Sequence, residues 1–143
     1  MSAVVIDSSI ALSWCFEDEA SPETDSLFER VRDEGAIVPG LWHLELSNVL
    51  LQAEKCGRIS AGDVATRLGL IAELPISTDQ ETTIRAWREI LTLARAESLT
   101  TYDATYLELA VRRGLPLLTK DNELGRAATR LGAEVFPLES GAI

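Results

Sequence analysis

The sequence predicts an α/β protein in which helices cover both faces of a parallel sheet. Short apolar runs alternate with helical patterns along the 143 residues, as in repeated strand–helix units. The first run, Ala3–Ile6, is apolar throughout, which is typical of a strand buried on both faces. No linker, repeat or low-complexity segment divides the chain, so residues 1–143 are expected to form one domain around one core.

The individual elements follow from their ends. Ser21 and Ser60 mark helix starts, and Gly35, Gly57 and Gly114 mark helix ends. We expect strands at residues 3–6, 36–39, 75–77, 116–119 and 134–136, with helices at 10–14, 22–34, 41–56, 60–73, 79–94, 102–113 and 122–131.

The helix that Asp79 opens carries a specific expectation. Its residues Ile84, Trp87, Leu91 and Ala94 recur at helical spacing, which predicts a single apolar face. We therefore expect Trp87 in the core or at an interface.

The helical hairpin at residues 41–73 is rich in apolar residues for two helices at the edge of a small sheet. We expect some of Leu51, Leu70 and Ile71 to face a partner rather than the core. This favours a homodimer whose hairpin also forms part of a binding groove.

Composition narrows the class of protein. A formal net charge of −10 argues against binding nucleic acid through a basic face, but not against a nuclease whose carboxylates hold cations. No apolar run approaches the ~18 residues of a membrane span, and the N-terminus lacks a basic secretory start. We therefore expect a cytoplasmic protein with no membrane attachment.

Cys15 and Cys56 lack metal-ligand spacing, so both are expected to be reduced, buried thiols.

Four acidic residues are expected at one edge of the sheet. Asp7 follows the first strand, and Asp121 lies just beyond the fourth. Asp103 falls in the first turn of its helix, and Glu45 lies early in the helix after the second strand. Acids at such places are often only helix caps. However, ligands of open parallel sheets bind outside the carboxyl ends of the strands, where these four would converge.

Converging carboxylates favour one kind of chemistry. They repel one another and raise some of their pKa values unless a cation is bound. A hard divalent ion, Mg²⁺ or Mn²⁺, is the natural partner, and it can activate water for phosphodiester hydrolysis. The side chains of Ser8, Ser9, Thr119 and Asn48 neighbour the acids in the predicted fold. They could contact a metal-bound water or a phosphate, or simply cap helices.

Three phrases of the chain resemble a known family. Ile6–Ser9, Tyr102–Ala110 and Leu118–Asp121 resemble the VapC toxins, a subgroup of the PIN-domain ribonucleases. The similarity covers essentially the whole chain, and its most specific part is the phrase YDAxYLxLA. The four acids are similar in spacing to the acidic quartet of that family.

The resemblance implies a PIN-like three-layer α/β/α sandwich, with a five-stranded parallel sheet in the order 3-2-1-4-5. It implies a metal-dependent endoribonuclease, the toxin of a type II toxin–antitoxin system, with Asp7, Glu45, Asp103 and Asp121 as catalytic residues. Mg²⁺ or Mn²⁺ would be held by three of them, Asp7, Asp103 and Asp121. A homodimer and a small VapB-like antitoxin are implied as well. Family members often have a further acid near the last aspartate, where this chain has Glu123.

The acidic cluster also predicts how the antitoxin would act. Without metal, four carboxylates on a chain of net charge −10 present a strongly negative cavity. Arg forks bidentately onto carboxylates, so we expect the antitoxin to insert an Arg, or less often a Lys, among the acids. The rest of its segment should be apolar and lie in the helical groove, because an exposed ion pair contributes only ~0.2–1 kcal/mol.

Two alternatives stay open. A receiver-like phospho-acceptor module also places acids and a Lys at this edge, and Lys120 fits superficially, but serines follow Asp7 where receivers have another acid. A catalytically inactive PIN-like interaction domain is disfavoured by the presence of all four acids. His43 suits a helix start or an interface better than a catalytic base, and Tyr106 is interpreted as a packing residue.

Overall fold

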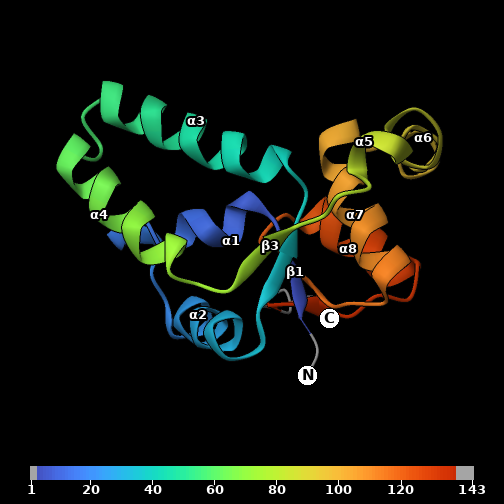
Figure 1. Cartoon of the computed structure of the whole chain (residues 1–143), viewed down its shortest axis with the longest axis horizontal. Helices are drawn as coiled ribbons and strands as arrows, with labels where there is room; N and C mark the ends of the chain where they lie inside the picture. Colours follow the sequence, from blue (N-terminus) through green and yellow to red (C-terminus); the bar gives the residue numbers. More distant parts are fainter. Residues whose placement is uncertain (1–2, 138–143) are drawn as a thin grey trace.

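Five parallel strands form the centre of the molecule (Figure 1). The computed structural model describes residues 3–137, and residues 1–2 and 138–143 of the predicted domain lie outside the described residues. The sheet has the order β3-β2-β1-β4-β5, which confirms the predicted fold class. Its strands are β1 (Val4–Ile6), β2 (Ala36–Val38), β3 (Ile76–Thr78), β4 (Leu117–Leu118) and β5 (Val135–Phe136).

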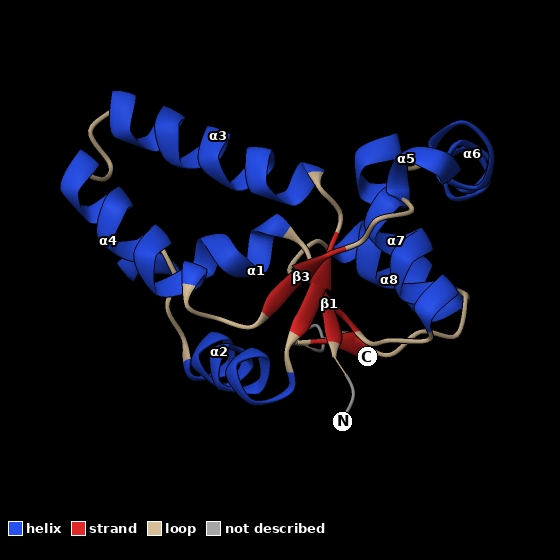
Figure 2. Ribbon diagram, viewed as in Figure 1, coloured by secondary structure: helices blue, strands red, loops and turns tan. Residues whose placement is uncertain are grey.

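Helices cover both faces of this sheet (Figure 2). One side carries α1 (Ser8–Ser13), η1 (Glu17–Glu19), α2 (Pro22–Glu34), α3 (Leu41–Lys55) and α4 (Ala61–Ala72). The other side carries α5 (Thr82–Arg85), the π-helical turn η2 (Ala86–Ile90), α6 (Leu91–Glu97), α7 (Thr101–Arg113) and α8 (Asn122–Arg130). Within residues 3–137, no helix is long and apolar enough to cross a membrane.

The order of the strands places the site. The chain builds β1, β2 and β3 in one direction and then returns to lay β4 on the other side of β1. Val5 accordingly pairs with Ile37 on one side and Leu117 on the other. Because right-handed crossovers on either side of this reversal put helices on opposite faces, a crevice opens at the carboxyl ends of β1 and β4.

Strand β1 and helix α7 are among the most deeply buried elements of the fold. All three β1 residues are fully buried between the two helical layers. Helix α7 packs against β1, β4, α6, η2 and α8, and the run Ala104–Ala110 is buried throughout. A helix enclosed on nearly every side needs few polar positions, and its two buried polar residues, Thr105 and Glu108, are both hydrogen-bonded.

The segment after β3 differs from the predicted single helix. Ile84 and Trp87 do not face the core: they are 78% and 90% exposed. The π-helical turn η2 interrupts the regular helix, so the inward face shifts to Ile90 and Ala94, which pack near Ala104 of α7. Periodicity assumes a constant 3.6 residues per turn, and the prediction of one face from Ile84 to Ala94 was wrong for that reason.

The expectation of two buried thiols is correct for one cysteine only. Cys15 is buried as predicted, but Cys56 is exposed at the end of α3, where the hairpin turns. In the hairpin, Leu51 and Leu70 are exposed, whereas Ile71 is only 6% exposed and belongs to the core.

A buried ion network joins β3 to α7. Arg112 donates to Asp79, with Nη2 2.9 Å from Oδ2, and to Glu108, with Nε 2.8 Å from Oε2. The three side chains are only 13%, 2% and 9% exposed. Burial alone would raise the pKa of Asp79, but hydrogen bonds from Arg112 and Thr82 outweigh it and lower that pKa. Arg112 therefore neutralises two buried carboxylates, one beyond the end of β3 and one on its own helix.

We predict that Arg112→Ala lowers the free energy of unfolding by about 3–5 kcal/mol, because it leaves buried carboxylates unpaired. Arg113→Ala is the matched control, since Arg113 is exposed and forms no ion pair within residues 3–137. Urea denaturation of both variants measures the difference. Equal stability of the two variants would contradict a structural role for the network.

Candidate active site

Asp7 lies at the carboxyl ends of the paired strands β1 and β4, where the strand order reverses. It follows β1 directly, and its backbone N–H donates to the carbonyl of Leu118 in β4 at 3.1 Å. Its carboxylate accepts hydrogen bonds from Ser9 Oγ at 2.6 Å, from the backbone of Ile10 at 3.2 Å and from Thr119 Oγ1. The residue is 5% exposed. Asp7 is thus both the N-cap of α1 and a buried carboxylate at the edge where ligands bind.

Two hydroxyl groups tie Asp7 to the loop after β4. Ser9 Oγ accepts from the backbone N–H of Lys120 at 2.9 Å, while Thr119 Oγ1 accepts from that of Asp121 at 2.9 Å. Each hydroxyl then has its own proton to give to Asp7, so the loop fixes the direction of both donors. Sequence reasoning placed Ser9 and Thr119 beside the acids, and the structure gives them a definite partner.

Asp121 and Asp103 approach from the starts of two helices. Asp121 caps α8 by accepting from the backbone of Glu123 at 2.9 Å. Asp103 lies in the first turn of α7, where its own N–H is capped by Thr100 Oγ1 at 3.1 Å. Both positions face the positive end of a helix dipole, which stabilises a carboxylate.

Glu45 reaches the cluster from α3 and is held there by a tyrosine. The buried hydroxyl of Tyr106 donates to Glu45 Oε1, joining α3 to α7 across the end of the sheet. Sequence reasoning interpreted Tyr106 only as a packing residue. Its place one turn after Asp103 on the same helix was the signal that could have indicated a contact with the acids.

The electrostatics show that these acids act on one another. Burial raises the pKa of Asp7 to about 6, and the charge of Asp121 adds to the effect, although the three hydrogen bonds to Asp7 oppose it. Burial followed by the charges of Asp121 and Glu123 raises the pKa of Asp103. Burial and the charge of Asp103 likewise raise the pKa of Glu45. Glu123, whose contribution the sequence left open, is therefore close enough to Asp103 to raise its pKa.

The donor set fits a hard divalent cation. All of the side chains concerned present oxygen, and raised carboxylate pKa values mark a place where a cation would relieve repulsion. Within residues 3–137, no three acidic, histidine or cysteine side chains already form a metal-coordinating group.

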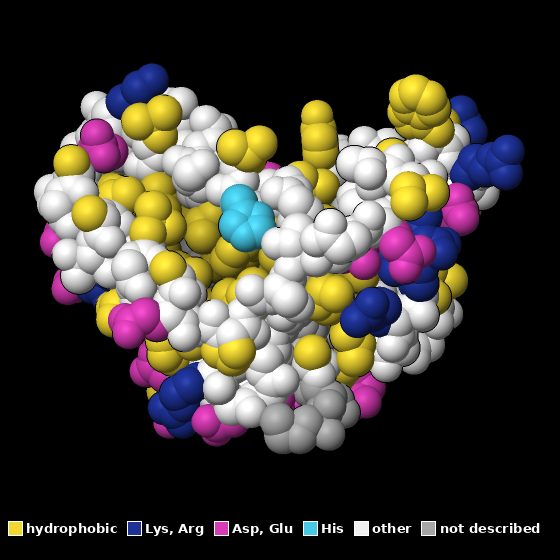
Figure 3. All heavy atoms as spheres, in the orientation of Figure 1, with side chains coloured by type: hydrophobic (Ala, Val, Ile, Leu, Met, Phe, Trp, Pro, Cys, Tyr) yellow, Lys and Arg dark blue, Asp and Glu magenta, His cyan; other side chains and the backbone are white. Residues whose placement is uncertain are grey.

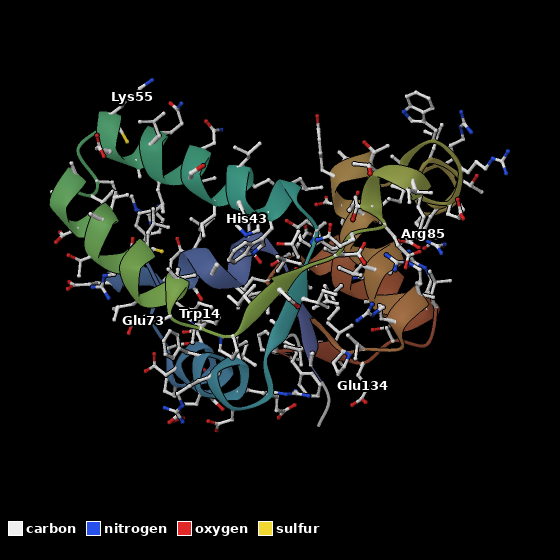
Figure 4. The ribbon with its side chains drawn as sticks, viewed as in Figure 1. Trp14, His43, Lys55, Glu73, Arg85 and Glu134 are labelled. Carbon is white, nitrogen blue, oxygen red and sulfur yellow. The ribbon has the colours of Figure 1, made fainter. Side chains whose placement is uncertain are left out.

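Ser8 and Asn48, which were also predicted near the acids, do not join the hydrogen bonds around Asp7 and Glu45. Ser8 is half-buried at the start of α1, and Asn48 is exposed one turn beyond Glu45 on α3. Neither side chain makes a hydrogen bond within the described part of the chain. His43 is exposed at the start of α3 (Figure 4), as expected for a helix-start residue. Its ring packs edge-on against that of Trp42.

Comparison with known proteins identifies the class. Residues 4–130 match the PIN domain model, so the chain belongs to the PIN domain family. PIN domains are generally nucleases that use divalent metal ions. Among solved structures, the chain is similar to PAE2754 from Pyrobaculum aerophilum at 23% identity and a TM-score of 0.69, covering 94% of this chain and 90% of that one. At this level of identity the likeness supports the fold. No curated protein gives a significant match.

We predict that, without divalent cations, ionisation of the Asp7 carboxylate makes the protein less stable at neutral pH than at acidic pH. The pKa of Asp7 is about 6 in the folded state and near 3.8 when unfolded, so folding favours the protonated form. Its contribution to stability is greatest below pH 4 and falls as pH rises toward 6 and above. The loss between pH 5 and pH 7 is about 1 kcal/mol.

Urea denaturation of the wild type and of Asp7→Asn at the two pH values isolates this effect. The variant cannot ionise at that position, so its stability should change about 1 kcal/mol less between them. Parallel behaviour of the two proteins would show that Asp7 is not a buried, strained carboxylate.

Proposed function

We propose that this protein is a Mg²⁺- or Mn²⁺-dependent endoribonuclease, acting as the toxin of a type II toxin–antitoxin system. The single observation that carries the nuclease proposal is the buried Asp7 carboxylate, with its pKa raised to about 6, beside Asp121 at the switch point of the sheet. RNA as the substrate and the toxin role rest on the resemblance of Tyr102–Ala110 and Leu118–Asp121 to VapC toxins.

The residues divide the work as follows. Asp7, Asp103 and Asp121 would hold the cation, which when bound supplies charge neutralisation and an activated water for phosphodiester hydrolysis. Ser9 and Thr119 fix the orientation of Asp7. Burial and the charge of Asp103 raise the pKa of Glu45, which makes this carboxylate a better proton acceptor than an ordinary glutamate. Tyr106 keeps Glu45 at the cluster.

A groove beside the acids supports the proposed antitoxin. A pocket of about 330 Å³ is lined by the apolar side chains of Leu12, Phe16 and Val49, together with the polar and charged residues Ser9, Glu19, Arg58, Lys120 and Asp121. Figure 3 also shows hydrophobic side chains in the hollow between α3 and α4, although α4 contributes no residue to the pocket beside the acids. An apolar antitoxin segment would lie in this groove and carry an Arg to the acids.

Cleavage of RNA tests the enzymatic proposal directly. Total RNA should be cut in the presence of Mg²⁺ and left intact with EDTA. Asp7→Asn should lower the rate by at least about 10³-fold, because the central ligand loses its charge. Asp25→Asn removes an exposed acid of α2 and serves as the control, with unchanged activity. Full activity in Asp7→Asn would refute the nuclease proposal, and inactivity of the wild type on every RNA would favour an interaction domain.

Inhibition tests the proposed antitoxin contact. The cognate antitoxin with its inserted Arg replaced by Ala should still bind through its apolar segment, yet inhibit poorly. Added Mg²⁺ should weaken inhibition by the wild-type antitoxin, because Arg and metal compete for the same carboxylates. Titration calorimetry and the cleavage assay measure the two effects separately. If the Arg→Ala antitoxin inhibits fully, the antitoxin blocks RNA at another surface.

A further inference from the structure

Two basic side chains beside the acidic cluster are bridged by one carboxylate. Glu19 of η1 accepts from Arg58 Nη2 through Oε2 at 3.0 Å and from Lys120 Nζ through Oε1 at 3.5 Å. Arg58 lies in the turn between α3 and α4, and Lys120 lies in the loop after β4. We call Arg58 and Lys120 the basic pair.

The backbone of Lys120 is fixed to the site. Its N–H donates to Ser9 Oγ at 2.9 Å, and Ser9 donates in turn to Asp7 at 2.6 Å. Lys120 also directly precedes Asp121. Both members of the basic pair line the pocket of about 330 Å³ that Ser9 and Asp121 line as well. The basic pair is therefore adjacent to the residues proposed to bind the cation.

Arg58 is held in a defined orientation. Its guanidinium lies over the ring of Phe16, with Cζ 3.7 Å from the ring centre, and its Nη2 lies 2.9 Å from Asp18 Oδ1. All of its hydrogen bonds to Asp18 and Glu19 come from Nη2. Within residues 3–137, Nε and Nη1 make no hydrogen bond, so Arg58 retains donors for a further acceptor.

An RNA substrate needs such donors at this place. The chain has a formal net charge of −10, and the proposed reaction brings a polyanion to its most acidic surface. The phosphates on either side of the cleaved one lie outside the acidic cluster and depend on donors from the protein, chiefly Arg and Lys. The basic pair supplies one residue of each kind in the pocket beside Asp121.

Glu19 occupies the position that a phosphate would take. A carboxylate and a phosphodiester both carry one negative charge and present oxygen acceptors to Arg and Lys. The side chains of Glu19, Arg58 and Lys120 are 29%, 41% and 37% exposed, and ion pairs with this much exposure contribute little to stability. A phosphate can therefore replace the carboxylate without a change in the charge balance of the pair.

We propose that Arg58 and Lys120 bind a backbone phosphate of the RNA next to the one that is cleaved, and that Glu19 occupies this subsite until RNA displaces it. The inference rests on the proposed function for the identity of the polyanion. Phosphate contacts fix the register of a strand but carry no sequence information, so the subsite lowers or raises the affinity for every RNA alike.

Fluorescence anisotropy of a fluorescein-labelled single-stranded RNA, measured with Mg²⁺, tests the subsite. All proteins carry Glu45→Gln, which keeps the three proposed cation ligands and slows cleavage. Adding Glu19→Gln should lower the dissociation constant at least about threefold at low salt, because the basic pair is freed for phosphate.

Glu17→Gln is the matched control for this variant. It makes the same change in net charge on the same turn, at a side chain that is 93% exposed, and should bind RNA like the parent protein. Equal affinities of Glu19→Gln and Glu17→Gln would overturn the proposal and leave Glu19 as a brace between η1 and its neighbouring loops. A gain in affinity cannot arise from a variant that fails to fold.

Removal of the basic pair should have the opposite effect. The double variant Arg58→Ala, Lys120→Ala should bind RNA at least about tenfold more weakly at low salt. The slope of log affinity against log salt should become flatter by about 0.7, the value for one phosphate contact on a single strand. The control Arg32→Ala, Lys55→Ala makes the same change in charge at exposed positions, on α2 and at the far end of α3 (Figure 4), and should keep the slope. An unchanged slope in the first double variant would overturn the proposal.

Binding and cleavage separate the subsite from the nuclease. RNA binding that depends on the basic pair, in a wild type that cuts no RNA, would refute only the nuclease. Cleavage by the wild type, with RNA binding that is independent of Arg58 and Lys120, would refute only the subsite. A parent protein that binds no RNA at low salt would overturn both.

Discussion

The structure depends on one buried carboxylate. Asp7 ends the central strand, caps α1 and accepts hydroxyl protons from Ser9 and from Thr119 of the loop after β4. Those hydroxyls are themselves oriented by backbone N–H groups of the same loop. A single side chain therefore links β1, α1 and β4 where the sheet reverses direction. Its ordinary structural role and its proposed catalytic role require the same position, so neither excludes the other.

Burial disfavours the charged form of the Asp7 carboxylate. Burial and the charge of Asp121 raise the pKa of Asp7, while its hydrogen bonds act in the opposite direction. Burial outweighs the hydrogen bonds, so the pKa is about 6. The pKa values of Asp103 and Glu45 are raised as well. Buried acids with raised pKa values repel one another, and this repulsion destabilises the fold. Clusters of this kind are therefore typical of functional sites. This supports a metal-dependent nuclease within the PIN domain family.

The sequence predicted the sheet and the acids because both depend on local signals. Apolar runs identified every strand, and acids just beyond strands or at helix starts placed Asp7, Asp103 and Asp121 at one edge. It did not predict the π-helical turn at Ala86–Ile90, because an extra residue in one turn leaves no mark on a short apolar pattern. Nor did it reveal the hydrogen bond from Tyr106 to Glu45, which joins residues 61 positions apart. Contacts of that kind depend on how helices pack.

Direct binding of Mn²⁺, measured by titration calorimetry in the absence of RNA, tests the central claim that Asp7 organises a cation site. The wild type should bind Mn²⁺, and Asp7→Asn should show no measurable binding. Thr119→Val, which removes a donor to Asp7 and keeps its carboxylate, should bind about 10–100-fold more weakly than the wild type. Equal affinity in all three proteins would contradict the account, because it would place the cation away from the residue on which the whole site is built.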